Sequence, residues 1–362
     1  MDLGVSMLAT KIIKCKVVEL TKIKQAILDA EYNNLQDILQ LSRLGLDFLP
    51  LYDNISIYSA NKATTLWQTK KIRKKNYPIC IRNDLIRLEQ RSTKLTKHWI
   101  RIPVKKRYGG VWLPVKPHCE IPEGAKIADS KLLRRKSTYW IYLVVKKEIS
   151  EISYSSVLAI DLGERVIATA CDSFDNQRPT FYGKEVRGTR RHYAWLRKRL
   201  GNKKLLRMIK KVGRKERKRV DEVLHAIARK IVERSVYNRS IIFLGDLKGI
   251  RSSAKGKRMR RIVGNMPYLK LTQYIEYKAA WQGIRVVKIS ERGTSRTCSR
   301  CGEKGKRPYQ GLFKCPACGY QANADHNGAK NILKRSLEYI SNDGAIAFSP
   351  KTELESVSAK AD

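Results

Sequence analysis

The chain has 362 residues, a hydrophobic content of 42% and a formal net charge of +42 at pH 7. This amount of apolar material excludes a wholly disordered protein, and the lack of an uninterrupted apolar run of about 18 residues argues against a membrane-spanning helix. So large a positive charge makes a polyanion the expected partner, with nucleic acid favoured over an anionic membrane surface.

Strand and helix patterns alternate in the N-terminal part. Residues 1–20 alternate loosely, as a strand does, and their apolar positions are too interrupted to resemble a signal peptide. Apolar residues recur at intervals of three or four over 21–48, which predicts a helix, and the basic segment QTKKIRKK follows at 68–75. Residues 98–148 return to a strand pattern. We therefore predict a β-rich unit that is interrupted by a helical insert.

A second unit is predicted to begin near residue 151. The segments SVLAIDLG, VIATAC, SIIFLGDL and IRVVKIS have strand patterns, and helices are expected between them. The helical residues 187–236 are very basic, because 16 of the 33 residues from Arg187 to Arg219 are Lys or Arg. Strands that are separated by helices indicate an α/β sheet with parallel members.

Two later segments of this unit are expected to be mobile. A Gly- and Arg-rich loop is predicted at 249–265, and its residues 252–265 are interpreted either as a disordered loop or as a mobile lid over a cleft. A short helix is expected to begin at Asn327, and the polar residues 341–362 are typical of a mobile tail.

Four of the eight cysteines form two C-x-x-C pairs. Thirteen residues separate the pairs, which consist of Cys298, Cys301, Cys315 and Cys318. Two such turns place four thiolates around one zinc ion, and four protein ligands leave no open position, so the predicted site is structural. The other four cysteines lie in or beside apolar stretches and are interpreted as small core residues in a reducing compartment.

Two aspartates stand at positions where metal ligands are often found. Asp161 ends the strand pattern SVLAID, and Asp325 follows Cys318 by seven residues, just before the predicted short helix. Carboxylates that face one cleft can hold a pair of divalent ions for phosphodiester hydrolysis. Taken alone, each would be interpreted as a turn former or a helix N-cap, but together in so basic a protein they favour a metal site.

Four segments, taken in order, resemble TnpB proteins, the transposon-encoded nucleases related to the type V CRISPR effectors. They are VLAIDLG, IIFLGDLKGI, YIEYKAAWQGIRVVKISERGTSRTCSRCG and FKCPACGYQANADHNGAKNIL, and the resemblance covers about residues 130–335. It implies an α/β fold with an RNase H-like RuvC domain and an inserted zinc ribbon. An N-terminal wedge β-barrel carrying a helical recognition insert is also implied.

The resemblance implies an RNA-guided DNA endonuclease that takes a guide RNA from its own element and cleaves double-stranded DNA beside a short flanking motif. Such a protein would have no membrane partner and would work in the cytoplasm in association with the nucleoid. The expected division of the chain is 1–20 for the first wedge strand, 21–75 for the recognition insert, 76–150 for the wedge barrel, 151–293 for RuvC, 294–321 for the zinc ribbon, 322–340 for the final RuvC motif and 341–362 for the tail.

By position, the resemblance makes Asp161 the first RuvC carboxylate and Asp325 the third, which with a second acid would bind about two Mg²⁺ ions. The second motif departs from the family pattern, because most relatives have a Glu where this chain has Gly245. Three interpretations remain open. The enzyme is inactive, or Asp246 reorients and acts as the second metal ligand, or another acidic residue supplies the missing carboxylate.

Glu291 is our candidate for that other acid. It follows the strand IRVVKIS, which is expected to lie parallel beside IIFLG. The carboxyl ends of neighbouring parallel strands share one rim, about 5 Å apart, so a Glu side chain can span the gap to Gly245. A solvated loop acid beside Arg292 is the plainer interpretation of the same residue.

Ten basic residues are candidate contacts for the phosphates of a guide–target duplex. Such contacts need no base recognition, since base pairing supplies the sequence. The candidates are Lys70, Lys71, Arg73, Lys74, Lys75, Arg214, Lys215, Arg217, Lys218 and Arg219. Two rival functions remain: a nuclease-inactive RNA-guided DNA-binding protein that acts as a repressor does, and an accessory transposase.

Overall fold

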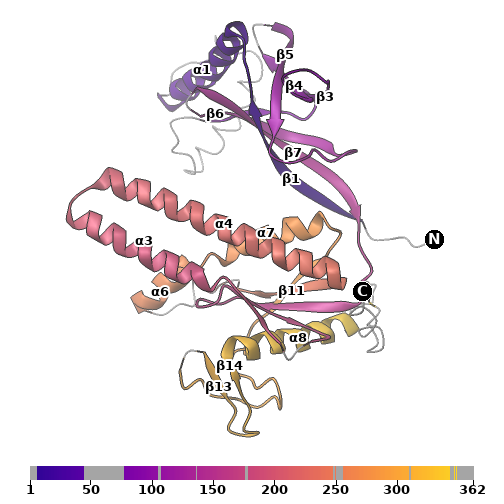
Figure 1. Cartoon of the computed structure of the whole chain (residues 1–362), viewed down its shortest axis with the longest axis vertical. Helices are drawn as coiled ribbons and strands as arrows, with labels where there is room; N and C mark the ends of the chain where they lie inside the picture. Colours follow the sequence, from indigo (N-terminus) through magenta and orange to yellow (C-terminus); the bar gives the residue numbers. More distant parts are fainter. Residues whose placement is uncertain are drawn as a thin grey trace. The chain divides into compact units, whose positions relative to one another are not determined.

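The computed structural model has two compact units, Leu8–Glu148 and a second formed by Met1–Met7 with Ile149–Asp362 (Figure 1). The described residues are 6–44, 77–104, 107–135, 137–175, 178–247, 249, 256–309, 311–342, 346 and 348. Within these ranges, no helix combines the length and apolar character that crossing a membrane requires.

In its described residues, the unit Leu8–Glu148 consists of a seven-stranded sheet and the helix α1. Its strands are ordered β2-β6-β7-β1-β5-β4-β3. The elements are β1 (Ser6–Val17), α1 (Lys22–Leu44), β2 (Ile79–Ile81), β3 (Arg87–Gln90), β4 (His98–Val104), β5 (Arg107–Pro117), β6 (Lys126–Arg135) and β7 (Thr138–Ser150). Residues alternate between buried and partly exposed along β4 and the first part of β7, as expected for strands with one face on a core. The predicted strands at 98–148 and the predicted helix are confirmed.

A polar cluster joins α1 to the hairpin β6–β7. The Tyr139 hydroxyl donates to Asp29 Oδ1 at 2.6 Å, and the Arg134 guanidinium donates to the same oxygen at 3.1 Å. Farther along the helix, the side-chain amide of Gln36 donates to the Tyr77 carbonyl and accepts from its N–H, both at 3.0 Å. These contacts fix the helix and the point at which the chain rejoins the sheet; the predicted basic segment 68–75 lies outside the described residues.

The unit that includes Ile149–Asp362 is built on a five-stranded sheet. Its strands are β8 (Ser156–Asp161), β9 (Ala168–Asp172), β10 (Thr180–Tyr182), β11 (Ser240–Asp246) and β12 (Val286–Ser290), in the order β10-β9-β8-β11-β12. Strands β8, β11 and β12 run parallel, and β9 and β10 are antiparallel to their neighbours. The predicted α/β sheet with parallel members is confirmed. Strands β8 and β11 are buried along almost their whole length, which is typical of a sheet covered on both faces.

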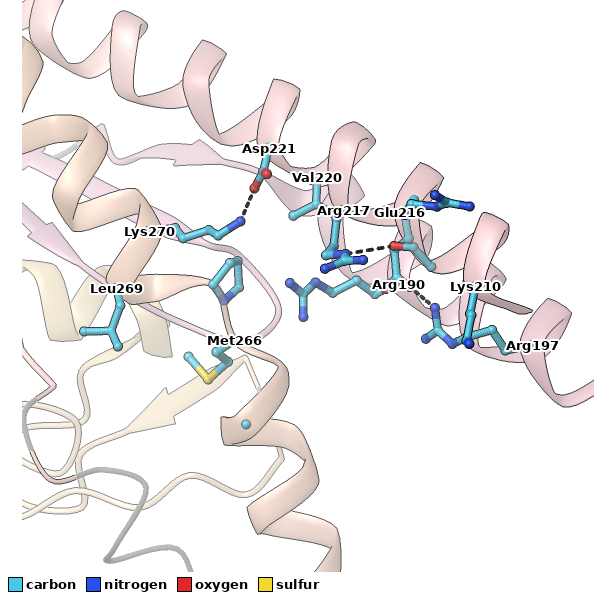
Figure 2. Close-up of a pocket in the computed structure, with 14 residues that line it drawn as sticks. Arg190, Arg197, Lys210, Glu216, Arg217, Val220, Asp221, Met266, Leu269 and Lys270 are labelled. Carbon is cyan, nitrogen blue, oxygen red and sulfur yellow. Dashed lines mark hydrogen bonds and ion pairs between the residues drawn. The ribbon is translucent and has the colours of Figure 1, made fainter. Parts of the chain in front are cut away.

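Among the described residues of this unit, five helices accompany the sheet. They are α3 (Lys184–Asn202), α4 (Leu206–Asn238), α6 (Gly256–Asn265), α7 (Tyr268–Ala280) and α8 (Ala324–Asn342). Figure 1 shows α4 and α7 over one face and α8 on the other. Leu224 and Ile231 of α4 are fully buried in the core, and on β11 the fully buried Phe243 contacts Tyr339 of α8, with ring centroids 5.8 Å apart. An ion pair between Lys270 Nζ and Asp221 Oδ1, 2.6 Å long, links α7 to α4 (Figure 2).

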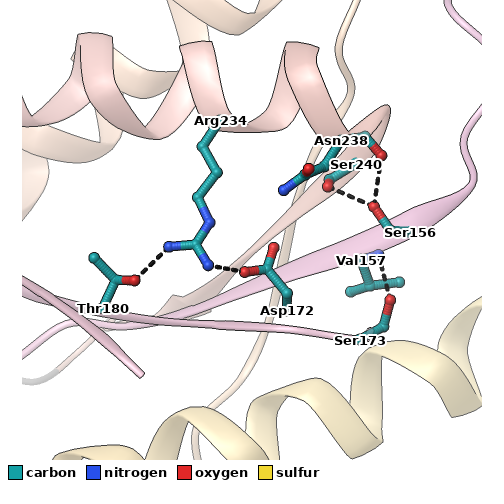
Figure 3. Close-up of polar contacts among 8 residues, drawn as sticks. All are labelled: Ser156, Val157, Asp172, Ser173, Thr180, Arg234, Asn238 and Ser240. Carbon is teal, nitrogen blue, oxygen red and sulfur yellow. Dashed lines mark hydrogen bonds and ion pairs between the residues drawn. The ribbon is translucent and has the colours of Figure 1, made fainter. Parts of the chain in front are cut away.

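A buried ion pair ties α4 to the antiparallel edge of the sheet (Figure 3). The Asp172 side chain at the end of β9 is fully buried, and its carboxylate is paired with Arg234 of α4, which also donates to the Thr180 hydroxyl. Nearby, the hydroxyl groups of Ser156 and Ser240 lie 2.6 Å apart and join the first residues of β8 and β11. This contact holds the first residues of β8 and β11 in register, so the carboxyl ends of the two strands lie at one edge of the sheet.

The structure differs from the sequence-based expectations at three places in this unit. Helix α6 occupies most of the predicted loop 249–265, although residues 250–255 lie outside the described residues. Helix α8 begins at Ala324 and not at Asn327. Within the predicted tail 341–362, Ile346 is buried in the core and Phe348 pairs with Tyr154, because both apolar side chains pack against the sheet. Most of the remaining tail lies outside the described residues.

Candidate active site

Three adjacent parallel strands end at one edge of the sheet with acidic residues. Strand β8 ends at Asp161, β11 ends at Asp246, and Glu291 directly follows β12. The register pairs Gly245 with Ile289 across β11 and β12, and Leu244 with Ile160 across β11 and β8. The predicted parallel placement of IRVVKIS beside IIFLG is therefore confirmed. The carboxyl ends of parallel strands are where α/β sheets commonly carry their ligands.

The Glu291 side chain fills the space beside Gly245. A Cβ atom added at Gly245 would lie 1.6 Å from Glu291 Oε1 and 2.4 Å from its Cγ, so no side chain at 245 fits while Glu291 stays in place. Asp246 is exposed, and successive strand residues project to opposite faces. The space that a side chain at position 245 would occupy is therefore filled by the carboxylate of Glu291 and not by that of Asp246.

Helix α8 brings Asp325 to the same region. The Asn323 side chain accepts from the backbone N–H groups of Asp325 at 2.9 Å and His326 at 3.2 Å, so Asn323 is the N-cap of this helix. Asp325 itself takes no part in the cap. A Cβ atom added at Gly328, one turn farther on, would lie 2.7 Å from Asp161 Oδ2, so the helix packs directly against the carboxylate at the end of β8.

Burial and mutual repulsion keep these carboxyls from ionising readily. Burial, with the nearby charge of Asp325, raises the pKa of Asp161 to about 7. Burial, with the charge of Asp161, raises the pKa of Glu291 to about 8. Burial also raises the pKa of Asp325 above its ordinary value, although nearby arginines act to lower it. Glu291 Oε1 is buried without a hydrogen-bond partner. A bound divalent cation would satisfy that oxygen and relieve the repulsion, so this donor set fits a hard cation.

The three carboxylates are more widely spaced than the ligands of a single small ion. Among the described residues, only the cysteine cluster brings three or more His, Cys, Asp or Glu ligand atoms within 4.8 Å of one another. Two ions about 4 Å apart, each about 2 Å from its oxygens, need ligand oxygens spread over as much as about 8 Å. The three carboxylates therefore do not form a compact single-ion cluster in this structure.

The four cysteines lie together in a small ribbon that includes β13 (Leu312–Lys314) and β14 (Gln321–Asn323). The Sγ atoms of Cys298 and Cys318 are 3.7 Å apart, and those of Cys301 and Cys315 are 3.5 Å apart. Tetrahedral zinc with Zn–S bonds of about 2.3 Å requires S···S distances of about 3.8 Å, whereas a disulfide is about 2 Å long. The cluster therefore fits a structural zinc ribbon.

Side chains on one face of α8 are hydrogen-bonded to the backbone of the segment between β12 and the ribbon. Asn327 donates to the Thr297 carbonyl, and Asn331 donates to the carbonyls of Thr294 and Thr297, all at 2.8 Å. Arg335 donates to the carbonyls on either side of Glu291, those of Ser290 at 2.6 Å and Arg292 at 2.7 Å. These hydrogen bonds were not predicted from the sequence. The four-residue spacing of the three α8 side chains places them on one helix face and could have indicated a shared contact.

The candidate nucleic-acid contacts on α4 separate into two groups. Arg214 and Arg217 line a hollow of about 840 Å³ between α3, α4 and the start of α7 (Figure 2). Lys215, Lys218 and Arg219 are exposed but do not line it. The other five candidates, Lys70, Lys71, Arg73, Lys74 and Lys75, lie outside the described residues.

The raised carboxyl pKa values predict how stability depends on pH. Without bound metal, folded Asp161 and Glu291 keep protons up to about pH 7 and about pH 8, whereas the unfolded chain loses them near pH 4. The folded state then binds more protons, so the free energy of unfolding should fall as pH rises through this window. Urea unfolding in EDTA should show a shallower fall for Asp161→Asn than for the wild type. An equal or steeper fall in the variant would contradict the assignment.

Comparison with known proteins gives these features a family context. The family model described as "Cas12f1-like, TNB domain" matches residues 268–332. The chain is 40% identical over 123 residues to "CRISPR-associated endodeoxyribonuclease Cas12f1" of Sulfoacidibacillus thermotolerans, which covers 33% of this chain and 28% of that protein. It is 28% identical over 209 residues to "TnpB-like protein MJ0751" of Methanocaldococcus jannaschii, covering 55% of this chain and 75% of that protein.

These matches show that the chain is similar to TnpB-like proteins and to type V effectors. The predicted resemblance is thus confirmed. The chain spans less than a third of the length of the Sulfoacidibacillus relative that it matches. A solved structure, "Cryo-EM structure of the Cas12f1-sgRNA-target DNA complex", aligns with 90% of this chain and 99% of its own, at 17% identity and a TM-score of 0.43.

Proposed function

We propose that this chain is a metal-dependent, RNA-guided DNA endonuclease. The observation that carries the proposal is the Glu291 carboxylate in the space beside Gly245, near Asp161 and on the edge to which α8 brings Asp325. Relatives named as endodeoxyribonucleases and as a TnpB-like protein support it. In this proposal the strand order β10-β9-β8-β11-β12 is that of an RNase H-like RuvC domain, and Glu291 takes the place of the second family carboxylate.

Asp161, Glu291 and Asp325 would hold Mg²⁺. When bound, such ions supply an activated water and stabilise the leaving oxygen of the phosphodiester. The protein's own part is to place the three carboxylates on rigid elements and to keep them partly buried. Arg165 and Arg307, whose charges act on Asp325, would favour a phosphate approaching that carboxylate.

The remaining features follow the family pattern. The cysteine ribbon, 294–321, would bind structural zinc within the RuvC domain, 151–293 and 322–340. The sheet of the N-terminal unit would be the wedge barrel, 1–20 and 76–150, with the recognition insert at 21–75. The partners would be a guide RNA from the protein's own element and double-stranded DNA with a short flanking motif. A related solved structure is a complex of Cas12f1 with sgRNA and target DNA, which supports this choice.

Co-expression with the flanking RNA of its own element tests the proposal. The complex would be purified, its RNA sequenced, and plasmid cleavage measured with Mg²⁺ and with EDTA. Cleavage that requires Mg²⁺ and a discrete bound RNA is the expected result. A discrete RNA with guided DNA binding but no cleavage would instead support the nuclease-inactive binder. Absence of any discrete RNA would contradict guided action and favour an accessory transposase.

A further inference from the structure

The first turn of α8 is built into the cysteine ribbon. Strand β14 of the ribbon ends at Asn323, whose side chain caps α8, and the helix begins at the next residue, Ala324. Ala324 is fully buried in the ribbon core with Cys298 and Cys315. Its N–H donates to the carbonyl of Gly311, also in the ribbon, at 3.1 Å. The position of this helix end therefore depends on how the ribbon is folded.

Asn327, one turn into α8, is hydrogen-bonded to the backbone on both sides of the candidate zinc ligand Cys298. Its side-chain amide donates to the Thr297 carbonyl at 2.8 Å, and its side-chain oxygen accepts from the Ser299 N–H at 2.9 Å. The Asn327 side chain is fully buried. Because an unpaired buried amide is costly, these two bonds hold the helix and the backbone around Cys298 in one fixed arrangement.

The same turn of α8 also meets the candidate catalytic carboxylates. Asp325 lies in the sequence between Ala324 and Asn327, the two residues through which the ribbon holds the helix. Gly328 follows Asn327 and packs against Asp161, since a Cβ atom at Gly328 would lie 2.7 Å from Asp161 Oδ2. A shift of this turn would therefore move one of the carboxylates and change the packing against another.

A chain of hydrogen bonds continues from Asn327 to Glu291. The Thr297 carbonyl, which accepts from Asn327, also accepts from Asn331 at 2.8 Å. Asn331 donates in addition to the Thr294 carbonyl at 2.8 Å. The Thr294 N–H and hydroxyl both donate to the Glu291 carbonyl, at 3.1 Å and 2.9 Å. The backbone between the ribbon and the third carboxylate is thus held on the same face of α8.

We propose that Asn327 is a positioning residue that couples zinc occupancy of the four-cysteine cluster to the placement of the three candidate catalytic carboxylates. When zinc holds Cys298, the backbone on either side of it is a fixed partner for Asn327, and the first turn of α8 is fixed in turn. When zinc is absent, that partner is no longer held. The proposal rests on the proposed nuclease function, which assigns the carboxylates their role, and it makes that site dependent on the ribbon.

Hydrogen–deuterium exchange, measured by mass spectrometry, tests this coupling without any nuclease activity. The full chain is compared with zinc bound and after a zinc-selective chelator has removed the zinc, both in buffer without Mg²⁺. In the wild type, zinc removal should speed exchange of the α8 peptide 324–331 about tenfold or more, because both Asn327 hydrogen bonds lose a fixed partner. Exchange along the buried strand β11 should change less than about twofold.

Asn327→Ala should exchange fast at this helix end even with zinc bound, and zinc removal should then change the rate less than about twofold. Asn342→Ala makes the same change at an exposed position in the last turn of α8 and should respond to zinc as the wild type does. If Asn327 had only a structural role, its loss would speed exchange in both zinc states and leave the response to zinc intact. That result would overturn the proposal, as would a wild-type α8 peptide that does not respond to zinc or a wild type that loses protection throughout β11.

Two further measurements keep the outcomes separate. If circular dichroism shows that Asn327→Ala is unfolded, Asn327→Asp replaces it, because aspartate keeps the size and the acceptor but loses the donor to Thr297; a full response to zinc in that variant would overturn the proposal. Half-maximal DNA cleavage by the folded variant should need about tenfold more Mg²⁺ than the wild type. A zinc response that depends on Asn327 in a protein that does not cleave DNA would refute the nuclease but keep the coupling. Cleavage together with an unchanged zinc response in the variant would refute the coupling but keep the nuclease.

Discussion

Glu291→Gln is expected to lower the rate of Mg²⁺-dependent DNA cleavage about a thousandfold or more, as removal of a group that acts within a catalytic unit does. The substitution keeps the size of the side chain and its place beside Gly245, but it removes the negative charge that two divalent ions require. Affinity for guide RNA should change less than about threefold, because no phosphate contact is lost. Single-turnover cleavage of a labelled target, with bound RNA quantified in parallel, measures both effects.

Two further variants test the role of Glu291: a control at Asp246 and a double variant that moves the acidic side chain from position 291 to position 245. Asp246→Asn removes a neighbouring exposed charge on β11 and should change the rate less than about tenfold, because that side chain points to the other face of the strand. Gly245→Glu combined with Glu291→Gly returns an acid to the same space and should restore part of the activity. Cleavage that is unchanged in Glu291→Gln, or that is lost in Asp246→Asn instead, would refute the role of Glu291.

Arg335→Gln is expected to slow cleavage about ten- to hundredfold and to raise the Mg²⁺ concentration needed for half-maximal rate. Arg335 donates to the carbonyls of Ser290 and Arg292 and so holds the Glu291 backbone from both sides. Charge-assisted hydrogen bonds contribute about 1.5–3 kcal/mol each, and about 1.4 kcal/mol corresponds to a tenfold change. Arg335 acts through Glu291 and is a positioning residue.

Lys334→Gln is the matched control for Arg335→Gln, because it removes one positive charge from the adjacent, exposed position of α8. It should leave both the rate and the Mg²⁺ dependence unchanged within about twofold. Arg335→Lys, which keeps the charge but loses the two-pronged guanidinium, should fall between the wild type and Arg335→Gln. If Arg335 had only a structural role, Arg335→Gln would lower the amount of folded protein, but the folded fraction would show the Mg²⁺ dependence of the wild type. That result would contradict a role for Arg335 in positioning Glu291.

Much of the site could be predicted from local patterns. The apolar runs before Asp161 and Gly245 indicate buried strands, and the parallel placement of IRVVKIS follows from the α/β pattern. Because parallel strands end at a common edge, the sequence alone predicts that Glu291 lies near Gly245, as the structure has it. The cysteine spacing likewise predicted a four-thiolate cluster, since two C-x-x-C turns are a nearly self-contained geometry.

The features that were not predicted depend on contacts between distant segments. Asn323 and not Asp325 caps α8, a choice decided by local backbone geometry and not by residue type. Helix α6 forms in a Gly- and Arg-rich segment where Val263 is buried, so packing overrides weak local propensity. The hollow of about 840 Å³ requires α3, α4 and α7 to be placed together, because its lining includes residues as far apart in the sequence as Arg190, Arg217 and Lys270.

Manganese in place of magnesium gives the most direct measurement of the central claim, that Asp161, Glu291 and Asp325 together bind the catalytic metal. Crystals of the protein with Mn²⁺, or of its RNA complex, would be recorded at the manganese absorption edge. We predict anomalous peaks within about 2.5 Å of oxygens from all three carboxylates, and their loss in Glu291→Gln. Peaks that are absent, or that persist unchanged in that variant, would contradict the account.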